Sequence, residues 1–156
     1  MLTIRDKEYL KAIFLLKGAS KPVGPSQLSK SINVTKEAAF QEMKRLEILG
    51  LGKHIKKKGL KLNKNAILTI ESDFKKHHIL EKFLRKSLNI SHEEACKESI
   101  NIDPYISEKL IDNISKKIGP LNNCDCGSSI KLSFKLKDVK NCNWIKKTVN
   151  GEIKRC

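Results

Sequence analysis

The sequence predicts a mainly α-helical protein in which one small β-hairpin separates an N-terminal set of helices from a second set. Apolar residues recur at helical spacing on both sides of the hairpin, and Pro, Gly and Asn separate the segments. Of the 156 residues, 39% are hydrophobic but only 5% are aromatic. The chain is therefore long enough for one compact core, or two small ones, built mainly from Leu and Ile.

Three helices are expected before the hairpin. Apolar residues at helical spacing in residues 3–16 predict the first, which Gly18 ends. Pro25 can open a second short helix, PSQLSKSI, and Thr35 can cap a third, TKEAAFQEMKRLEIL. The apolar face of this third helix consists of Ala39, Met43 and Leu46. Two helices joined by such a short turn are typical of a helix-turn-helix.

The segment after the third helix strengthens this interpretation. GLGKHIKKKGLKLNKNAILTI contains two short extended runs around Lys57, Lys58 and Gly59, which predicts a β-hairpin with a basic tip. Three helices followed by a basic hairpin form the winged-helix arrangement. Residues 1–71 are therefore predicted to be a winged helix-turn-helix DNA-binding domain.

Residues 72–120 are predicted to form a second, helical domain. A long helix is expected from Ser72 to Leu88, and Ser91 begins an S-x-x-E capping pattern for the next. Pro104 is expected to open a third helix. The apolar positions of this third helix are Ile106, Leu110 and Ile114. Apolar faces of this size suggest contact between two copies of the chain.

Residues 121–156 form a Cys-containing tail in which KLSFKLK alternates like a strand and NWIKKTVNGEIKR resembles a hairpin. The four cysteines of the tail are Cys124, Cys126, Cys142 and Cys156. Their spacing matches no tight zinc motif. Two interpretations stay open: a Cys-ligated zinc or iron–sulfur site, or a tail with unpaired thiols.

Net charge restricts the class of partner. Thirty-two Lys and Arg against 17 Asp and Glu give a formal charge of +15, which favours a polyanion. Nucleic acid is the first candidate, ahead of an anionic membrane surface or attachment to the ribosome. No apolar run approaches the ~20 residues that cross a bilayer, and the N-terminus does not resemble a signal peptide, so a cytoplasmic protein is expected.

Three of the four histidines lie in the segment KKHHILEKFLRKSLNISHEEACKE. On a helix, His77 and Glu81 share one stripe with Leu84 and Leu88, two leucines expected to pack inward. His78 lies about 100° away and is expected to face solvent. A buried carboxylate needs a partner, and a His and a Glu one turn apart can reach one divalent cation.

The next predicted helix carries a similar pair, His92 and Cys96, again one turn apart. Because only a short turn separates the two segments, both pairs can converge on one ion. The alternatives are a helix-surface pair between His77 and Glu81 and a Cys96 that only packs in the core.

Five motifs carry a resemblance to a known family. They are EYLKAIFLL at 8–16, GLKLNKNA in the hairpin, HHILEKFL at 77–84, HEEAC at 92–96 and CDCG at 124–127. In this order and spacing the chain resembles the diphtheria-toxin-repressor and manganese-transport-regulator family of metal-dependent transcriptional repressors.

The resemblance implies two metal positions. The ligand positions of the ancillary site hold His77, Glu81 and His92. At the primary site Glu8 and Cys96 match, whereas Ser99 and Ile100 stand where the family has Glu and His. The primary site is then reduced or lost, or Glu98 completes it. We favour the first, because Glu98 lies about 200° around the helix from Cys96.

Ligand chemistry narrows the choice of cation. Oxygen and imidazole ligands suit Fe(II) or Mn(II), which we prefer, whereas a cysteine also draws Zn(II), Co(II) or Ni(II).

The resemblance and the helix-turn-helix pattern together imply that a homodimer reads a double-stranded DNA operator. Candidate base-reading residues at the start of the third helix are Thr35, Lys36, Glu37, Ala38 and Gln41. Candidate phosphate contacts are Lys44, Lys56, Lys57, Lys58 and Lys61. Phe40 is given no reading role.

The expected function is a metal-dependent transcriptional regulator, a repressor, of iron or manganese homeostasis genes. The alternative is a winged-helix regulator without divalent-metal control that senses through the cysteine tail. An enzyme is not expected, because the sequence offers no nucleophile–base set and no glycine-rich phosphate loop.

Overall fold

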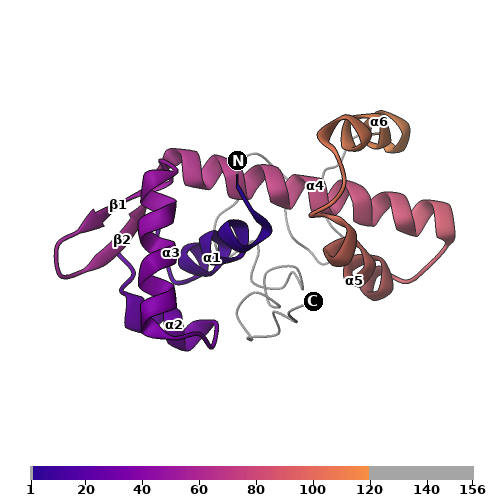
Figure 1. The fold of residues 1–156 in the computed structure, drawn as a ribbon. Coiled ribbons are helices and arrows are strands. Elements are labelled where there is room, and N and C mark those ends of the chain that lie inside the picture. The colour runs from indigo at the N-terminus through magenta and orange to yellow at the C-terminus, as the bar shows by residue number, and fades with distance from the viewer. Residues whose placement is uncertain (1, 120–156) are drawn as a thin grey trace. The chain divides into compact units, whose positions relative to one another are not determined.

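The computed structural model describes residues 2–119, which divide into two compact units, residues 2–70 and residues 71–119. Each is described by itself. The expectations for the cysteine tail, including Cys124, Cys126, Cys142 and Cys156, lie outside the described residues. The mainly α-helical fold with a small two-stranded sheet is confirmed (Figure 1).

The elements follow in the expected order. They are α1 (Ile4–Leu15), α2 (Pro25–Ser31), α3 (Lys36–Ile48), β1 (Gly52–Ile55), β2 (Gly59–Leu62), α4 (Lys64–Leu88), α5 (His92–Ile102) and α6 (Glu108–Ile118). Among the residues that the structure describes, no helix is both long and apolar enough to span a bilayer.

The helix-turn-helix is formed by α2 and α3, with α1 completing the unit. Thr35 caps α3 by accepting a hydrogen bond from the Ala38 amide at 3.1 Å, as its residue type predicts. Ala39, Met43 and Leu46 are all fully buried, which confirms the apolar face expected for this helix. That face points into the unit, so the opposite face of α3 is exposed.

The hairpin forms the wing. Strands β1 and β2 are antiparallel, with Lys53 opposite Lys61 and the basic turn at residues 56–58. On its other edge, β2 pairs with the segment before α2, because Val23 and Leu60 exchange backbone hydrogen bonds of 2.9 and 3.0 Å. This pairing attaches the wing to the segment before α2.

Gly59 permits that close approach. Its φ is +111°, and a Cβ there would lie 2.0 Å from the carbonyl oxygen of Val23. We expect Gly59→Ala to lower the free energy of unfolding by about 2–4 kcal/mol, combining strain and clash. Gly50→Ala is the matched control: its φ is +73° but no atom lies within 4 Å of the added Cβ. Chemical denaturation should show a clearly smaller loss for the control, and equal losses would contradict this role.

A charge cluster around the buried Asp6 joins α1 to α3. The guanidinium of Arg45 donates to both oxygens of Asp6, which also completes a capping box with Thr3. Arg45 therefore holds the pKa of Asp6 well below its usual range. Glu42, 6% exposed, lies beside Asp6 and 3.2 Å from Arg5. Burial and the neighbouring Asp6 raise the pKa of Glu42 to about 7.

This raised pKa predicts a pH dependence. Between pH 4.5, where an unfolded Glu ionises, and about 7, folded Glu42 keeps a proton that the unfolded chain has lost. Its contribution to stability is thus full below that window and falls as pH rises, by about 1–3 kcal/mol. Asp6 acts in the opposite direction only in more acidic solution. Subtracting the pH profile of Glu42→Gln from that of the wild type should isolate this fall, and parallel profiles would contradict it.

The core of the second unit lies where α4 packs on α6. Buried Ile79 and Leu80 meet Ile111 and Ile114, and partly buried apolar residues surround them. The remaining members are Phe83, Leu84, Ile106 and Ile118. In addition, the buried ammonium of Lys76 donates to the Ile106 carbonyl, which ties the segment before α6 to α4.

Two helix starts differ from the prediction. Helix α4 begins at Lys64 rather than Ser72, since Asn63 accepts a hydrogen bond from the Ala66 amide and no breaker follows. Helix α6 begins after Ser107, which caps it, rather than at Pro104. Of the three apolar positions named for this helix, Ile114 is buried, Ile106 is partly buried and Leu110 is 48% exposed.

Candidate metal centre and DNA-reading surface

Helix α4 is covered on every side over one turn and a half. All six residues from Lys76 to Glu81 are buried, although their side chains point in different directions around the helix. His77 is fully buried and Glu81 is 3% exposed. Two ionisable groups thus lie in an interior where each needs a partner.

His77 has partners for both ring nitrogens. Its Nδ1 lies 2.9 Å from Oδ2 of Asp103, and its Nε2 lies 3.5 Å from both Glu81 Oε2 and Cys96 Sγ. A carboxylate on one nitrogen is the usual way in which proteins orient a metal-binding imidazole. Asp103 therefore directs Nε2 toward Glu81 and Cys96.

Asp103 was not foreseen from the sequence, and it yields a prediction. Asp103→Asn is expected to lower divalent-metal affinity about 10- to 100-fold, because the amide no longer fixes the His77 ring as a carboxylate does. Isothermal titration against the wild type measures the loss. Asp112→Asn, an exposed Asp on α6, is the matched control and should change nothing. Equal affinities for the wild type and Asp103→Asn would show that Asp103 has only a structural role.

The expectation that His78 faces solvent is wrong. His78 is 2% exposed, its ring packs edge-on against Phe74 at 4.3 Å, and its Nδ1 lies 3.3 Å from Glu81 Oε2. The stripe argument assumed one buried face, whereas α4 is buried all round here. The opposite error affects Leu88, predicted to pack inward but 60% exposed near the end of the helix.

Glu81 links the two helices. Its Oε2 faces His77 and His78, while its Oε1 lies 2.9 Å from Nδ1 of His92 on α5. Ser91 caps α5 by accepting from the Glu94 amide, which sets the position of His92 in the first turn. The structure therefore brings together four of the expected side chains: His77, Glu81, His92 and Cys96.

The pKa shifts of His77 and Glu81 indicate which groups of this cluster carry charge. Burial opposes a charge on His77, but Asp103, Cys96 and Glu81 together raise its pKa to about 10. Burial likewise opposes a charge on Glu81, yet His77 and His78 lower its pKa to about 2. Glu81 is thus an anionic carboxylate facing imidazole nitrogens. Such a donor set fits a divalent cation, which would replace the proton's positive charge.

The candidate DNA-reading side chains lie on the outside of the first unit. The exposed ones are Thr35, Lys36, Glu37, Gln41, Lys44, Lys56, Lys57, Lys58 and Lys61, and Ala38 is partly buried. Phe40 lies among them at 37% exposure, with the Lys44 ammonium 4.6 Å from its ring centre. Phe40 is therefore not a core residue, and it belongs to this surface.

Two models of a single protein family match the chain. The iron dependent repressor N-terminal DNA binding domain matches residues 1–60, and the metal binding and dimerisation domain of that family matches residues 70–132. The chain belongs to the iron-dependent repressor family. The resemblance inferred from the motifs is confirmed, and the protein is a metal-dependent, DNA-binding transcriptional regulator.

Individual relatives agree with this assignment. An uncharacterised HTH-type transcriptional regulator of Methanocaldococcus jannaschii is 23% identical over 109 residues, which cover 69% of the repressor and 87% of that relative. A hypothetical protein of Sulfolobus solfataricus superposes with a TM-score of 0.75 at 27% identity, covering 84% of the repressor and 100% of that chain. ScaR with bound Zn²⁺ gives 0.70 at 22% identity, over 80% of the repressor but 58% of ScaR. The likeness to ScaR shows the fold.

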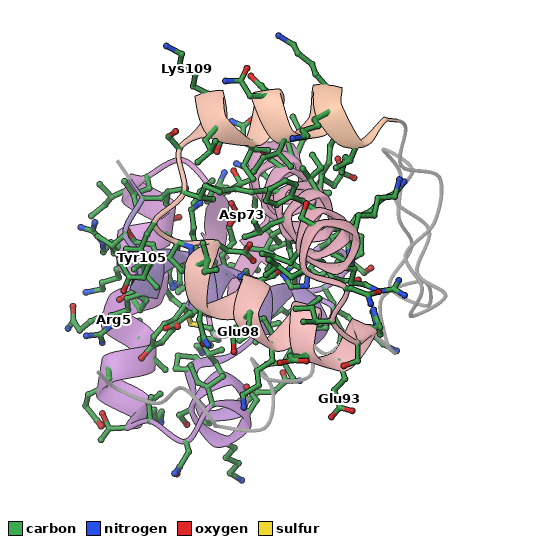
Figure 2. The ribbon with its side chains drawn as sticks, turned by 90° about the vertical axis from the view of Figure 1, so that its right-hand side faces the viewer. Arg5, Asp73, Glu93, Glu98, Tyr105 and Lys109 are labelled. Atoms are coloured by element: carbon green, nitrogen blue, oxygen red, sulfur yellow. The ribbon has the colours of Figure 1, made fainter. Side chains whose placement is uncertain are left out.

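Cys96 and Ser99 stand at positions that the resemblance assigns to a primary site, and both are buried on α5. Cys96 is 1% exposed, and Ser99, one turn later, is fully buried with no hydrogen-bond partner for its hydroxyl among the described residues. Glu98 is exposed, on a different side of α5 from buried Cys96. Figure 2 labels Glu98 on that helix, further along it than Glu93. This exposure gives Glu98 no evident role beside Cys96.

Glu8 belongs to α1, in the first unit, and is partly buried. Burial raises the pKa of its carboxyl, an effect that Lys11 and Arg5 oppose. Its predicted role as a ligand to the repressor's metal stays a prediction.

Proposed function

We propose that the repressor holds a divalent transition-metal cation with His77, Glu81 and His92. The observation that carries the proposal is the placement of Glu81, whose two oxygens lie 3.5 Å from His77 Nε2 and 2.9 Å from His92 Nδ1. A buried carboxylate between imidazoles from two helices matches the ligand preference of such cations. His77 and Glu81 on α4 and His92 on α5 would hold the cation, which would supply positive charge beside the buried Glu81 carboxylate.

The choice of cation follows from the donors. Imidazole and carboxylate suit Fe(II) and Mn(II), and Cys96, 3.5 Å from His77 Nε2, adds a thiol that draws Fe(II), Zn(II), Co(II) or Ni(II). Fe(II) suits both kinds of donor and is our preferred ion. The regulated genes would then be those of iron or manganese homeostasis.

We further propose that the repressor binds a DNA operator as a homodimer. The exposed start of α3 would read bases in the major groove, with Gln41 suited to adenine and the Ala38 methyl to a thymine methyl. The wing lysines would contact phosphate and set the salt dependence without specifying sequence. Acting on the chromosome, the protein would work in the cytoplasm.

Continuity of α4 supports coupling between cation and DNA. This helix starts at Lys64, two residues after strand β2 of the wing ends, and carries His77 and Glu81 further along. A cation that favours one arrangement of α4 can therefore affect the orientation of the two α3 helices in a dimer. The cation's influence is limited to the difference in its affinity for the two arrangements.

Gel-shift affinity for the DNA upstream of its own gene, measured across a panel of divalent ions, tests the proposal. Binding that tightens about 5- to 150-fold with Fe(II) or Mn(II) and reverses on chelation would support it. Binding indifferent to every ion would contradict it and leave a winged-helix regulator without metal control. The same titration on the Glu8→Ala variant tests whether Glu8 on α1 contributes to the metal response. Loss of the effect of metal on DNA affinity in this variant would assign that role to Glu8.

A further inference from the structure

His78 has no role in the ligand positions that the family pattern implies, yet it is placed like a ligand. It is buried at 2% exposure between Phe74 and His77, with ring centres 4.3 and 5.0 Å from its own. An apolar residue would fill this space without the cost of removing a polar ring from water. The imidazole instead directs Nδ1 to within 3.3 Å of Glu81 Oε2.

The three groups form a compact donor set. One ligand atom each from His77, His78 and Glu81 lies within 4.8 Å of the others, and all three residues are buried. Two donors about 2.0–2.1 Å from a tetrahedral ion lie about 3.3–3.4 Å apart. The Oε2 atom of Glu81 lies 3.5 Å from His77 Nε2 and 3.3 Å from His78 Nδ1, which is close to that spacing. Small movements of the side chains would thus suffice to close around a cation.

We propose that His78 is a further direct ligand of the cation, added to His77, Glu81 and His92. This inference rests on the proposed function, because it specifies the ligands of that same site. The added imidazole makes the set richer in nitrogen, which shifts the preference from Mn(II) toward Fe(II), Co(II) and Zn(II). His92 and Cys96 adjoin the set through Glu81 and His77, respectively.

Co(II) binding to the full chain under anaerobic conditions tests the proposal, because Co(II) absorbs visible light according to its ligands. The variants are His78→Phe, which keeps a buried aromatic ring, and His54→Phe on β1 as the control. We expect His78→Phe to lower Co(II) affinity at least about 10-fold and to change the visible spectrum, while the control matches the wild type. An unchanged affinity and spectrum in His78→Phe would overturn the proposal.

A second measurement needs no variant. In the Zn(II)-loaded wild type, nitrogen NMR of the histidine rings should show a metal-bound ring nitrogen for His78 as well as His77. A His78 ring whose signals do not move on Zn(II) addition would also overturn it. If the wild type binds neither Co(II) nor Zn(II), the proposed function itself fails. If His77→Ala abolishes binding and His78→Phe does not, only the role of His78 fails.

Discussion

Replacing His77 by alanine is expected to lower divalent-metal affinity by at least about 100-fold, beyond the effect of losing an orienting partner. The substitution removes the ring that contacts Glu81, Cys96 and Asp103 at once. DNA affinity in the presence of metal should fall to that of the metal-free wild type, a loss of about 5- to 150-fold. Calorimetric metal titration and fluorescence anisotropy with labelled operator DNA measure the two effects.

Ser87→Ala is the control for this variant, because Ser87 is exposed on the same helix, ten residues away. Its metal and DNA affinities should equal those of the wild type. Metal-dependent DNA binding that survives in a folded His77→Ala variant would place the sensing site elsewhere. The cysteine tail would then be the next region to examine.

Neutralising the wing tip is expected to weaken DNA binding about 10- to 1000-fold. The change is Lys56, Lys57 and Lys58 to Gln, all exposed at the turn between β1 and β2. If each lysine contacts one phosphate, the slope of log affinity against log salt should become shallower by about 3. Anisotropy titrations at several salt concentrations give the slope.

The matched control removes the same number of charges from exposed positions on α6. Lys109, Lys116 and Lys117 to Gln should lower affinity only slightly, through the reduced net charge, and should leave the salt slope nearly unchanged. Figure 2 shows Lys109 extending away from α6. If both triple variants lose the same amount, net charge rather than the wing carries the interaction.

The first unit could be predicted closely because its signals are local. Thr35 caps α3 and Pro25 opens α2, each through backbone chemistry of its own segment. The close approach of Gly59 to Val23 joins distant parts of the chain and was not predicted. The two misplaced helix starts also have local caps, Asn63 and Ser107, which the prediction did not use. Residues 64–71 contain no breaker and combine β-branched residues with helix formers, so their state depends on the cap by Asn63.

In the second unit, helical spacing predicted only part of the candidate metal site. Periodicity identified His77 and Glu81, since both lie on one stripe of one helix. Asp103 could not be found this way, because its contact with His77 joins the end of α5 to the middle of α4. His78 was wrongly predicted to face solvent because the argument from spacing assumed that only one face of the helix is buried. Ile79 and Leu80, which follow His78 on other faces, are apolar and indicate that α4 is buried on all sides here.

The central claim, that a cation in the second unit controls DNA binding by the first, is tested most directly by reciprocity. The measurement is the Fe(II) affinity of the wild-type repressor, determined anaerobically with and without saturating operator DNA. The account predicts that DNA tightens Fe(II) binding by the same factor by which Fe(II) tightens DNA binding. Identical Fe(II) affinities in the two titrations would contradict it, because two coupled sites cannot respond in one direction only.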